Sequence, residues 1–164
     1  MTQSSASAPA TTTPSLDTRG PLQYLIARGE IGVKERAGDA DNPRVLEYMS
    51  ATRLPKRLIR DETAWCSAFV NWCMMKANVP RTNKANALSW LTWGVPLNGP
   101  TLGCVVVFNR HVAGKPDGVH GHVAFFVRVE GDNIVCLGGN QHNEVCEARY
   151  PLSRLLAYRG PATV

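Results

Sequence analysis

The chain is predicted to fold as an α+β domain, with helices in its first half and an antiparallel sheet in its second half. Apolar residues recur at helical spacing between residues 21 and 93. After Gly103 the pattern changes to β-branched runs, two of which flank a tight Gly131-Asp132 turn. Helices followed by hairpin-forming strands are typical of the α+β class. The 164 residues suffice for one domain with its own core.

The N-terminal segment, residues 1–20, is rich in Ser, Thr, Ala and Pro and contains no apolar block. We expect a disordered tail there, followed by a single domain over residues 21–164. The tail lacks the positive and apolar regions of a secretory signal peptide. No apolar stretch approaches the roughly 20 residues needed to span a bilayer, so no transmembrane segment is expected.

Four helices are expected after the tail. Pro21 suits the first turn of the first helix, and Asn42 caps the second, which has Pro43 at its first position. Thr63 or Asp61 can cap the third helix, which carries a helical stripe of apolar residues. The expected helices cover residues 21–31, 43–50, 65–78 and 85–93.

Four or five strands are expected in the second half of the chain. They cover residues 104–110, 122–131, 133–140 and 144–150, with residues 154–160 as a candidate last strand. The segments 94–103 and 110–121 contain many turn residues and are expected to be loops.

The net charge of +5 and a pI of about 9.1 predict attraction to polyanions, among them an anionic cell wall. The basic residues are scattered apart from one loose cluster, Arg53, Lys56, Arg57 and Arg60. Neither a basic-aromatic patch nor a nucleic-acid-binding motif is present, so nucleic acid is not an expected partner.

One of the five cysteines has a position that favours reactivity. Cys66 stands in the first turn of the third helix, where the helix dipole favours a thiolate. The backbone N–H groups of Cys66 and Ser67 are candidate donors to an oxyanion. A core cysteine is the alternative, and it is the expected role of Cys73, deeper in the same helix. The spacings match no zinc site, and neither a metal nor a cofactor is expected.

A reactive thiol needs a base and a group that orients the base. His122 begins the apolar strand after the Gly-rich connector, whereas His120 stands in a glycine-flanked loop. Asn140 ends the next strand, and it can lie near the start of the His122 strand if the two form a hairpin. Taken singly, each residue also has a purely structural interpretation, but their order along the chain favours a Cys-His-Asn site.

Four blocks of sequence carry a resemblance to a known group of enzymes: WCSAFVNW at 65–72, GCVVVF at 103–108, GHVAFFV at 121–127 and GGNQHN at 138–143. The layout resembles the papain-like bacterial cell-wall hydrolases of the CHAP and NlpC families. Within them it looks like a compact subfamily of peptidoglycan hydrolases found in phage lysins and as interbacterial toxins delivered by type VI secretion. The similarity runs from about residue 22 to the C-terminus.

This resemblance implies a papain-like fold, with N-terminal helices packed on a small, mostly antiparallel, barrel-like sheet. Cys66 matches the nucleophile, His122 the general base and acid, and Asn140 the orienting residue. Many relatives carry an aspartate directly before the cysteine, where this chain has Trp65. Candidate substrate contacts are Trp65, Trp90, Trp93, His120 and Gln141, with a core role as the alternative for the tryptophans.

The implied function is hydrolysis of an amide or peptide bond in peptidoglycan, within the stem peptide or between stem and glycan. The resemblance further implies a bacteriolytic toxin or lysin that reaches the periplasm or cell wall without a signal peptide. A toxin would be accompanied by an immunity protein. Two alternatives remain open: an inactive wall-binding or adaptor module, and a thiol transferase or deamidase acting on proteins.

Overall fold

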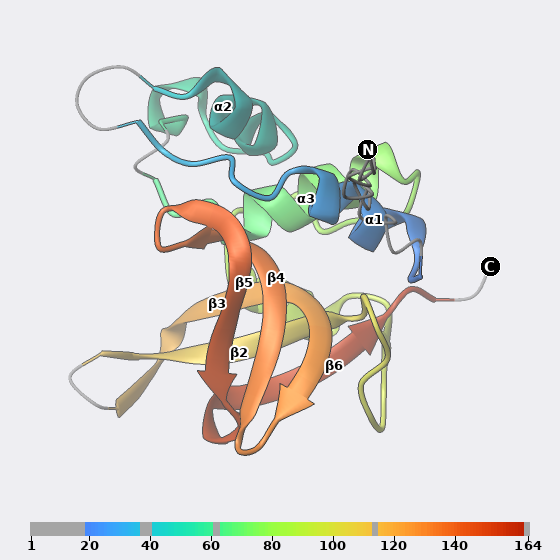
Figure 1. Ribbon diagram of the computed structural model, residues 1–164. Helices are drawn as coiled ribbons and strands as arrows, with labels where there is room; N and C mark the ends of the chain where they lie inside the picture. Colours follow the sequence, from blue (N-terminus) through green and yellow to red (C-terminus); the bar gives the residue numbers. More distant parts are fainter. Residues whose placement is uncertain (1–18, 37–40, 61–62, 113–114, 163–164) are drawn as a thin grey trace, which may run out of the picture.

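The computed structural model describes residues 19–36, 41–60, 63–112 and 115–162, so the expected tail lies almost entirely outside it. Within these ranges the helices lie on one side of a curled sheet (Figure 1), which confirms the α+β fold. The helical segments are α1 (Leu22–Gly29), α2 (Pro43–Ser50), η1 (Lys56–Leu58), α3 (Cys66–Lys76), η2 (Ala87–Thr92) and η3 (Leu152–Arg154). The strands are β1 (Val95–Pro96), β2 (Val105–Val112), β3 (Lys115–Glu130), β4 (Asn133–Gln141), β5 (Glu144–Pro151) and β6 (Leu155–Gly160).

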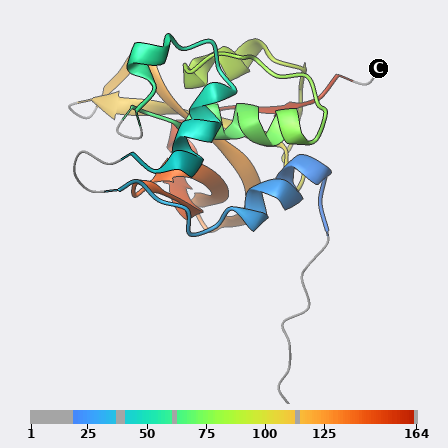
Figure 2. The ribbon, with the colours of Figure 1, turned by 90° about the horizontal axis from the view of Figure 1, so that it is seen from above.

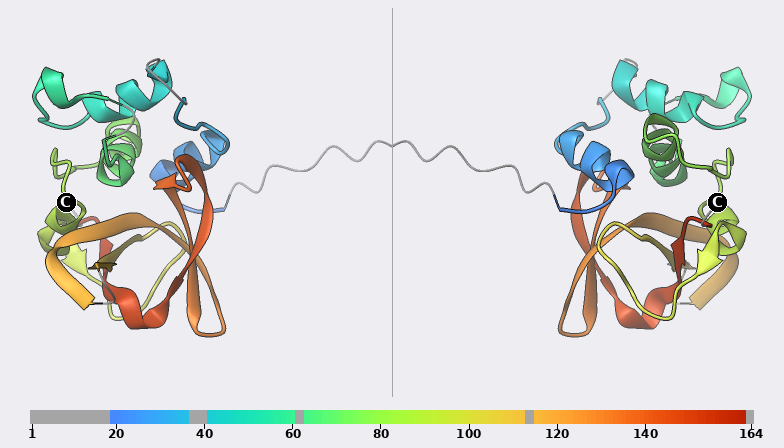
Figure 3. Two further views of the ribbon diagram at one scale, coloured as in Figure 1. Left: turned by 90° about the vertical axis from the view of Figure 1, so that its left-hand side faces the viewer. Right: turned by 90° about the vertical axis from the view of Figure 1, so that its right-hand side faces the viewer.

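The described strands form one antiparallel sheet in the order β1-β6-β2-β3-β4-β5. Seen from above, the helices cover one side of this sheet (Figure 2), and the side views show the strands curling beneath them (Figure 3). The larger apolar core lies between the helices and the sheet. A smaller core, around Val106, Phe108 and Phe126, fills the inside of the curl. The sheet is therefore barrel-like, as expected.

The sequence pattern predicted the main strands correctly, but it missed β1 and the extensions of β2 and β3. The Gly131-Asp132 turn joins β3 to β4, with Glu130 opposite Asn133, as the hairpin signal predicted. The predicted loop 110–121 is wrong in part, because β2 and β3 extend into it. The predicted loop 94–103 contains β1, which pairs with β6.

Helix α3 lies at the centre of the molecule and holds Cys66 in its first turn. The nine residues from Cys66 to Met74 are all buried, because α1 and α2 pack on one side of the helix and β3 and β4 on the other. Its buried polar residues are hydrogen-bonded: the Asn71 amide donates to the Lys84 carbonyl at 3.1 Å and accepts from the Asn83 N–H at 2.7 Å. This packing fixes the start of α3 against the sheet.

The N-terminus of α3 has no side-chain cap, so the predicted cap at Thr63 is wrong. Trp65 occupies the cap position, and the Thr63 hydroxyl donates instead to the Leu58 carbonyl at 2.9 Å. Asp61, the alternative cap, lies outside the described residues.

Candidate active site

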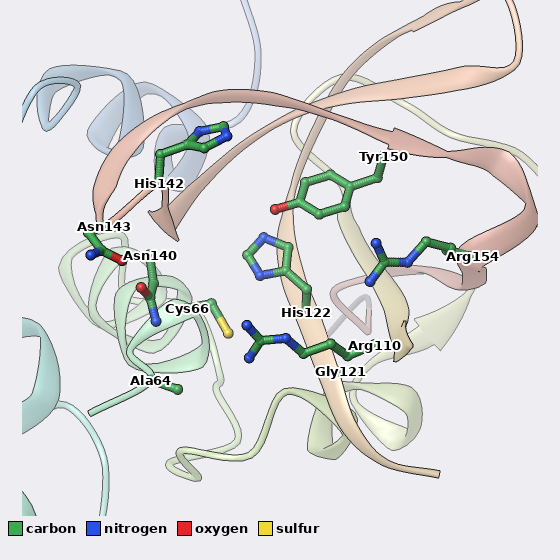
Figure 4. A pocket seen from close by; sticks show the side chains of 10 residues that line it. All are labelled: Ala64, Cys66, Arg110, Gly121, His122, Asn140, His142, Asn143, Tyr150 and Arg154. Carbon is green, nitrogen blue, oxygen red and sulfur yellow. The ribbon is translucent and has the colours of Figure 1, made fainter. Parts of the chain in front are cut away.

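The Cys66 thiol points from the start of α3 into a cavity that it shares with His122 (Figure 4). The residue is only 7% exposed. Backbone N–H groups of Val123 and Ser67 are positioned to hydrogen-bond the sulfur, and the Arg110 guanidinium adds a favourable charge. All three favour the ionised sulfur. The cysteine therefore stands where the sequence predicted it, at the N-terminus of a helix packed on the histidine strand.

The His122 imidazole is held in a fixed plane by aromatic stacking. It stacks on the Tyr150 ring, with 4.8 Å between centroids and 21° between planes. Tyr150 in turn stacks on Phe108 at 4.8 Å, and Phe108 pairs with His122 across β2 and β3. Tyr150 thus links the histidine to a ring of β2, and all three residues come from strands of the same sheet.

Gln141 sets the tautomer of this histidine. Its side-chain oxygen lies 2.9 Å from Nε2 of His122. Its side-chain nitrogen donates to the carbonyls of Cys136 at 3.3 Å and Cys146 at 2.5 Å. Because the amide nitrogen is committed to two carbonyls, the amide oxygen must accept, and Nε2 must carry a proton. In the neutral ring, Nδ1 is then an acceptor, and it faces Cys66 (Figure 4).

The hydrogen bond to His122 that was expected of Asn140 is made by Gln141 instead. The reason is a bulge in β4. Gly138 pairs with Cys146 and Gln141 pairs with Glu144, so three steps along β4 match two steps along β5. The extra residue reverses which side chains face the inside of the curl. Asn140 adopts a left-handed φ of 56° at this bulge. Gln141 takes the place that Asn140 would have in a regular strand.

Asn140 instead braces the residue before the cysteine. In the amide orientation that satisfies both of its groups, its nitrogen donates to Glu35 Oε1 at 3.3 Å and its oxygen accepts from the Trp65 N–H at 3.2 Å. The Trp65 indole also donates to Glu35 Oε1, at 2.7 Å. A Cβ at Gly139 would lie only 2.4 Å from the Trp65 ring, so only glycine allows β4 to approach this closely. Trp65 is thus part of a brace at the start of α3.

The other candidate substrate contacts separate into core and cavity residues. Trp65 and Trp90 are fully buried and Trp93 is 8% exposed, so all three pack in the core. The Trp90 indole donates to the Ser67 hydroxyl at 2.9 Å, which ties η2 to the first turn of α3. His120 does line a cavity beside Cys66.

Burial controls the protonation of both reactive groups. It raises the pKa of the Cys66 thiol, and this outweighs the backbone N–H groups that favour the thiolate. It lowers the pKa of His122 to about 4, a change that the Gln141 hydrogen bond opposes and that Arg110 and Arg154 reinforce. The thiolate expected from helix position alone is not the resting state: near neutral pH both groups are uncharged.

Two cavities meet at Cys66. The larger, of about 300 Å³, contains His122, Tyr150 and Arg154, and its lining is shown in Figure 4. The smaller, of about 110 Å³, is lined by small side chains including Ala85 and Ala87. Cys66 and Arg110 line both. The thiol therefore lies at the wall that the two cavities share.

The sequence profile of the CHAP domain matches residues 59–140, half of the chain. The chain belongs to the CHAP family. CHAP domains are typically hydrolases that act on peptidoglycan, so membership of the family supports a cell-wall hydrolase and implies peptidoglycan as the substrate. The match covers Cys66 and His122 and ends one residue before Gln141. No curated protein and no solved structure gives a significant match. No helix in the described part of the CHAP protein could cross a membrane.

Proposed function

We propose that this protein cleaves an amide bond of peptidoglycan, within the stem peptide or between stem and glycan, by a thiol mechanism. The observation that carries the proposal is that Cys66 and His122 line one cavity, while the buried Gln141 holds Nε2 of His122 at 2.9 Å. In this mechanism neutral His122 takes the thiol proton at Nδ1 as the sulfur attacks the carbonyl. The N–H groups of Cys66 and Ser67 stabilise the oxyanion.

The second half of the reaction uses the same groups. The imidazolium of His122 gives its proton to the leaving amine, which departs and leaves a thioester on Cys66. His122 then removes a proton from water as the water oxygen attacks the thioester carbonyl. The C–S bond breaks, the acid part of the substrate leaves as a carboxylic acid, and His122 returns its proton to the sulfur of Cys66. Gln141 accepts from Nε2 throughout and keeps Nδ1 facing the sulfur.

Digestion of purified sacculi tests this proposal. We expect soluble fragments whose masses identify one cleaved amide bond, and we expect none with the Cys66→Ala protein. Fragments that appear equally with both proteins would contradict the thiol mechanism. Intact sacculi after prolonged incubation with folded wild-type protein would contradict the proposed substrate.

We further propose that the protein acts as a bacteriolytic toxin or lysin on the wall side of the membrane. Expression in a bacterium with an added secretion signal is then expected to lyse the cells, whereas expression without it is expected to be tolerated. Lysis by both forms, or by the secreted Cys66→Ala protein, would contradict this role.

Gln141→Ala is expected to lower kcat by about ten- to hundredfold, since a hydrogen bond to a charged group is worth about 1.5–3 kcal/mol. The matched variant is Asn140→Gly, which keeps the left-handed backbone and removes the amide that braces Trp65. It should lower kcat less than Gln141→Ala does. Steady-state kinetics on a soluble stem peptide measures both, with thermal unfolding to confirm folding. If Asn140→Gly lowered kcat as much as Gln141→Ala, or more, Asn140 rather than Gln141 would be the residue that orients His122.

The pH dependence of kcat/KM is expected to show an acid limb at about 4, the pKa of His122. Below this pH the imidazole is protonated and cannot accept the thiol proton, so kcat/KM falls as pH decreases. In Gln141→Ala the acid limb should shift to a lower pH, because the Gln141 hydrogen bond raises the pKa of His122 and the variant lacks it. A peptide whose carboxylates are carboxamides should be used, since carboxylates titrate in the same range. A limb near 6.5 would show that His122 is not the base or is solvated.

A further inference from the structure

The larger cavity carries two guanidinium groups that the thiol mechanism does not use as proton donors or acceptors. Arg110 lies near the end of β2, two residues after Phe108, where the pairing of β2 with β3 becomes irregular. Arg154 ends η3 and lies over the Tyr150 ring, 5.9 Å from its centroid. Both point into the cavity (Figure 4), and both lower the pKa of His122.

Neither arginine pairs with an aspartate or glutamate among the residues that the structure describes. Arg154 donates from Nε and Nη2 to the Asn109 carbonyl at 3.2 and 3.1 Å, which fixes the guanidinium and leaves Nη1 available. Arg110 forms no ion pair with any described residue. Among the described residues that line the cavity there is no aspartate or glutamate. Elsewhere on the described surface, by contrast, arginines such as Arg128 and Arg149 pair with carboxylates.

Two guanidinium groups beside His122 repel the imidazolium that forms during catalysis, because like charges disfavour the charged form. A bound anion would relieve this repulsion. Guanidinium groups match carboxylates in geometry, and stem peptides offer free carboxylates beside their amide bonds. The smaller cavity has mostly small side chains in its walls, including Ala85 and Ala87, so it suits an alanine-sized side chain.

We propose that Arg110 and Arg154 form a subsite for a substrate carboxylate, so that stem peptides with a free acid next to the scissile bond are preferred. This inference rests on the proposed function, since it names the part of the stem peptide that the same site recognises. Binding of the acid also neutralises the two charges that face His122 and makes protonation of the imidazole easier when it takes the thiol proton. The carboxylate therefore contributes to kcat as well as to KM.

A pair of soluble stem peptides tests the subsite. The two peptides differ only in one group beside the scissile bond, a carboxylate or the corresponding carboxamide. The wild-type protein is expected to prefer the acid by about ten- to hundredfold in kcat/KM. The Arg110→Gln and Arg154→Gln variants should each reduce this ratio, and the double variant should bring it close to one. Arg149→Gln, which removes an exposed arginine paired with Glu130, should leave the ratio unchanged.

Binding to the Cys66→Ala protein gives a readout that does not need turnover. Calorimetry should show the same preference for the acid, and both glutamine substitutions should remove it. No preference in the wild type, or a preference retained in the double variant, would overturn the subsite while leaving the proposed function intact. Failure of the wild type to cleave either peptide or any sacculus would instead overturn the proposed function.

Discussion

Replacing Cys66 with alanine is expected to lower the rate of peptidoglycan cleavage by about a thousandfold or more, as removal of a covalent nucleophile does in comparable enzymes. Among the described residues that line the larger cavity, Cys66 alone combines a nucleophilic side chain with a position at a helix N-terminus. The loss should appear in kcat, because the alanine protein keeps the cavity and its binding groups. Dye release from labelled sacculi measures it.

Cys73→Ala is the matched control, since Cys73 lies seven residues further along the same helix and is fully buried. It removes one sulfur from the core, so it should cost of the order of 1 kcal/mol of stability and leave the activity of the folded protein near wild type. If the Cys73 variant lost activity while the Cys66 variant kept it, the assignment of the nucleophile would be wrong.

His122→Ala is expected to have an effect of similar size, about a thousandfold in kcat/KM, because no other base in the cavity is held against the thiol. His142 lines the same cavity, but its side chain is exposed and Gln141 does not hold its ring. The thiol in this variant would have to ionise unaided in a buried site that raises its pKa. Activity should therefore recover partly at alkaline pH.

His120→Ala provides the comparison for this variant. His120 is exposed at the rim of the smaller cavity, and its loss should change KM more than kcat. Kinetics of the two variants on one soluble peptide distinguishes the two histidines. If the His120 variant were inactive and the His122 variant active, His120 rather than His122 would be the catalytic base.

The elements that sequence predicts well are those with a local signal. Helical spacing places α3, and the Gly131-Asp132 turn places the β3–β4 hairpin. Strand β1 was missed because two residues, Val95 and Pro96, are too few to show any period, and their pairing with β6 is a long-range contact. The cap of α3 was mispredicted because Trp65 takes the cap position without any side-chain cap, and its own N–H is bound by Asn140, far away in the chain.

The candidate site shows the same limit. Cys66 and His122 could be chosen from their positions at the start of a helix and a strand. Gln141 could not, because one extra residue in β4 decides whether position 140 or 141 faces the imidazole, and only the Gly138-Gly139 pair hints at irregularity. The protonation states also depend on tertiary burial, which reversed the effect expected from the helix dipole alone.

Alkylation of Cys66 tests the central claim most directly. The protein should be treated with iodoacetamide at about pH 8, where a thiol can react, and the modified residue located by peptide mass spectrometry. A Cys146→Ser background removes the one cysteine that is not buried. Cleavage of sacculi should fall in direct proportion to the fraction of Cys66 that carries the label. Full activity in protein whose Cys66 is completely alkylated would contradict the account.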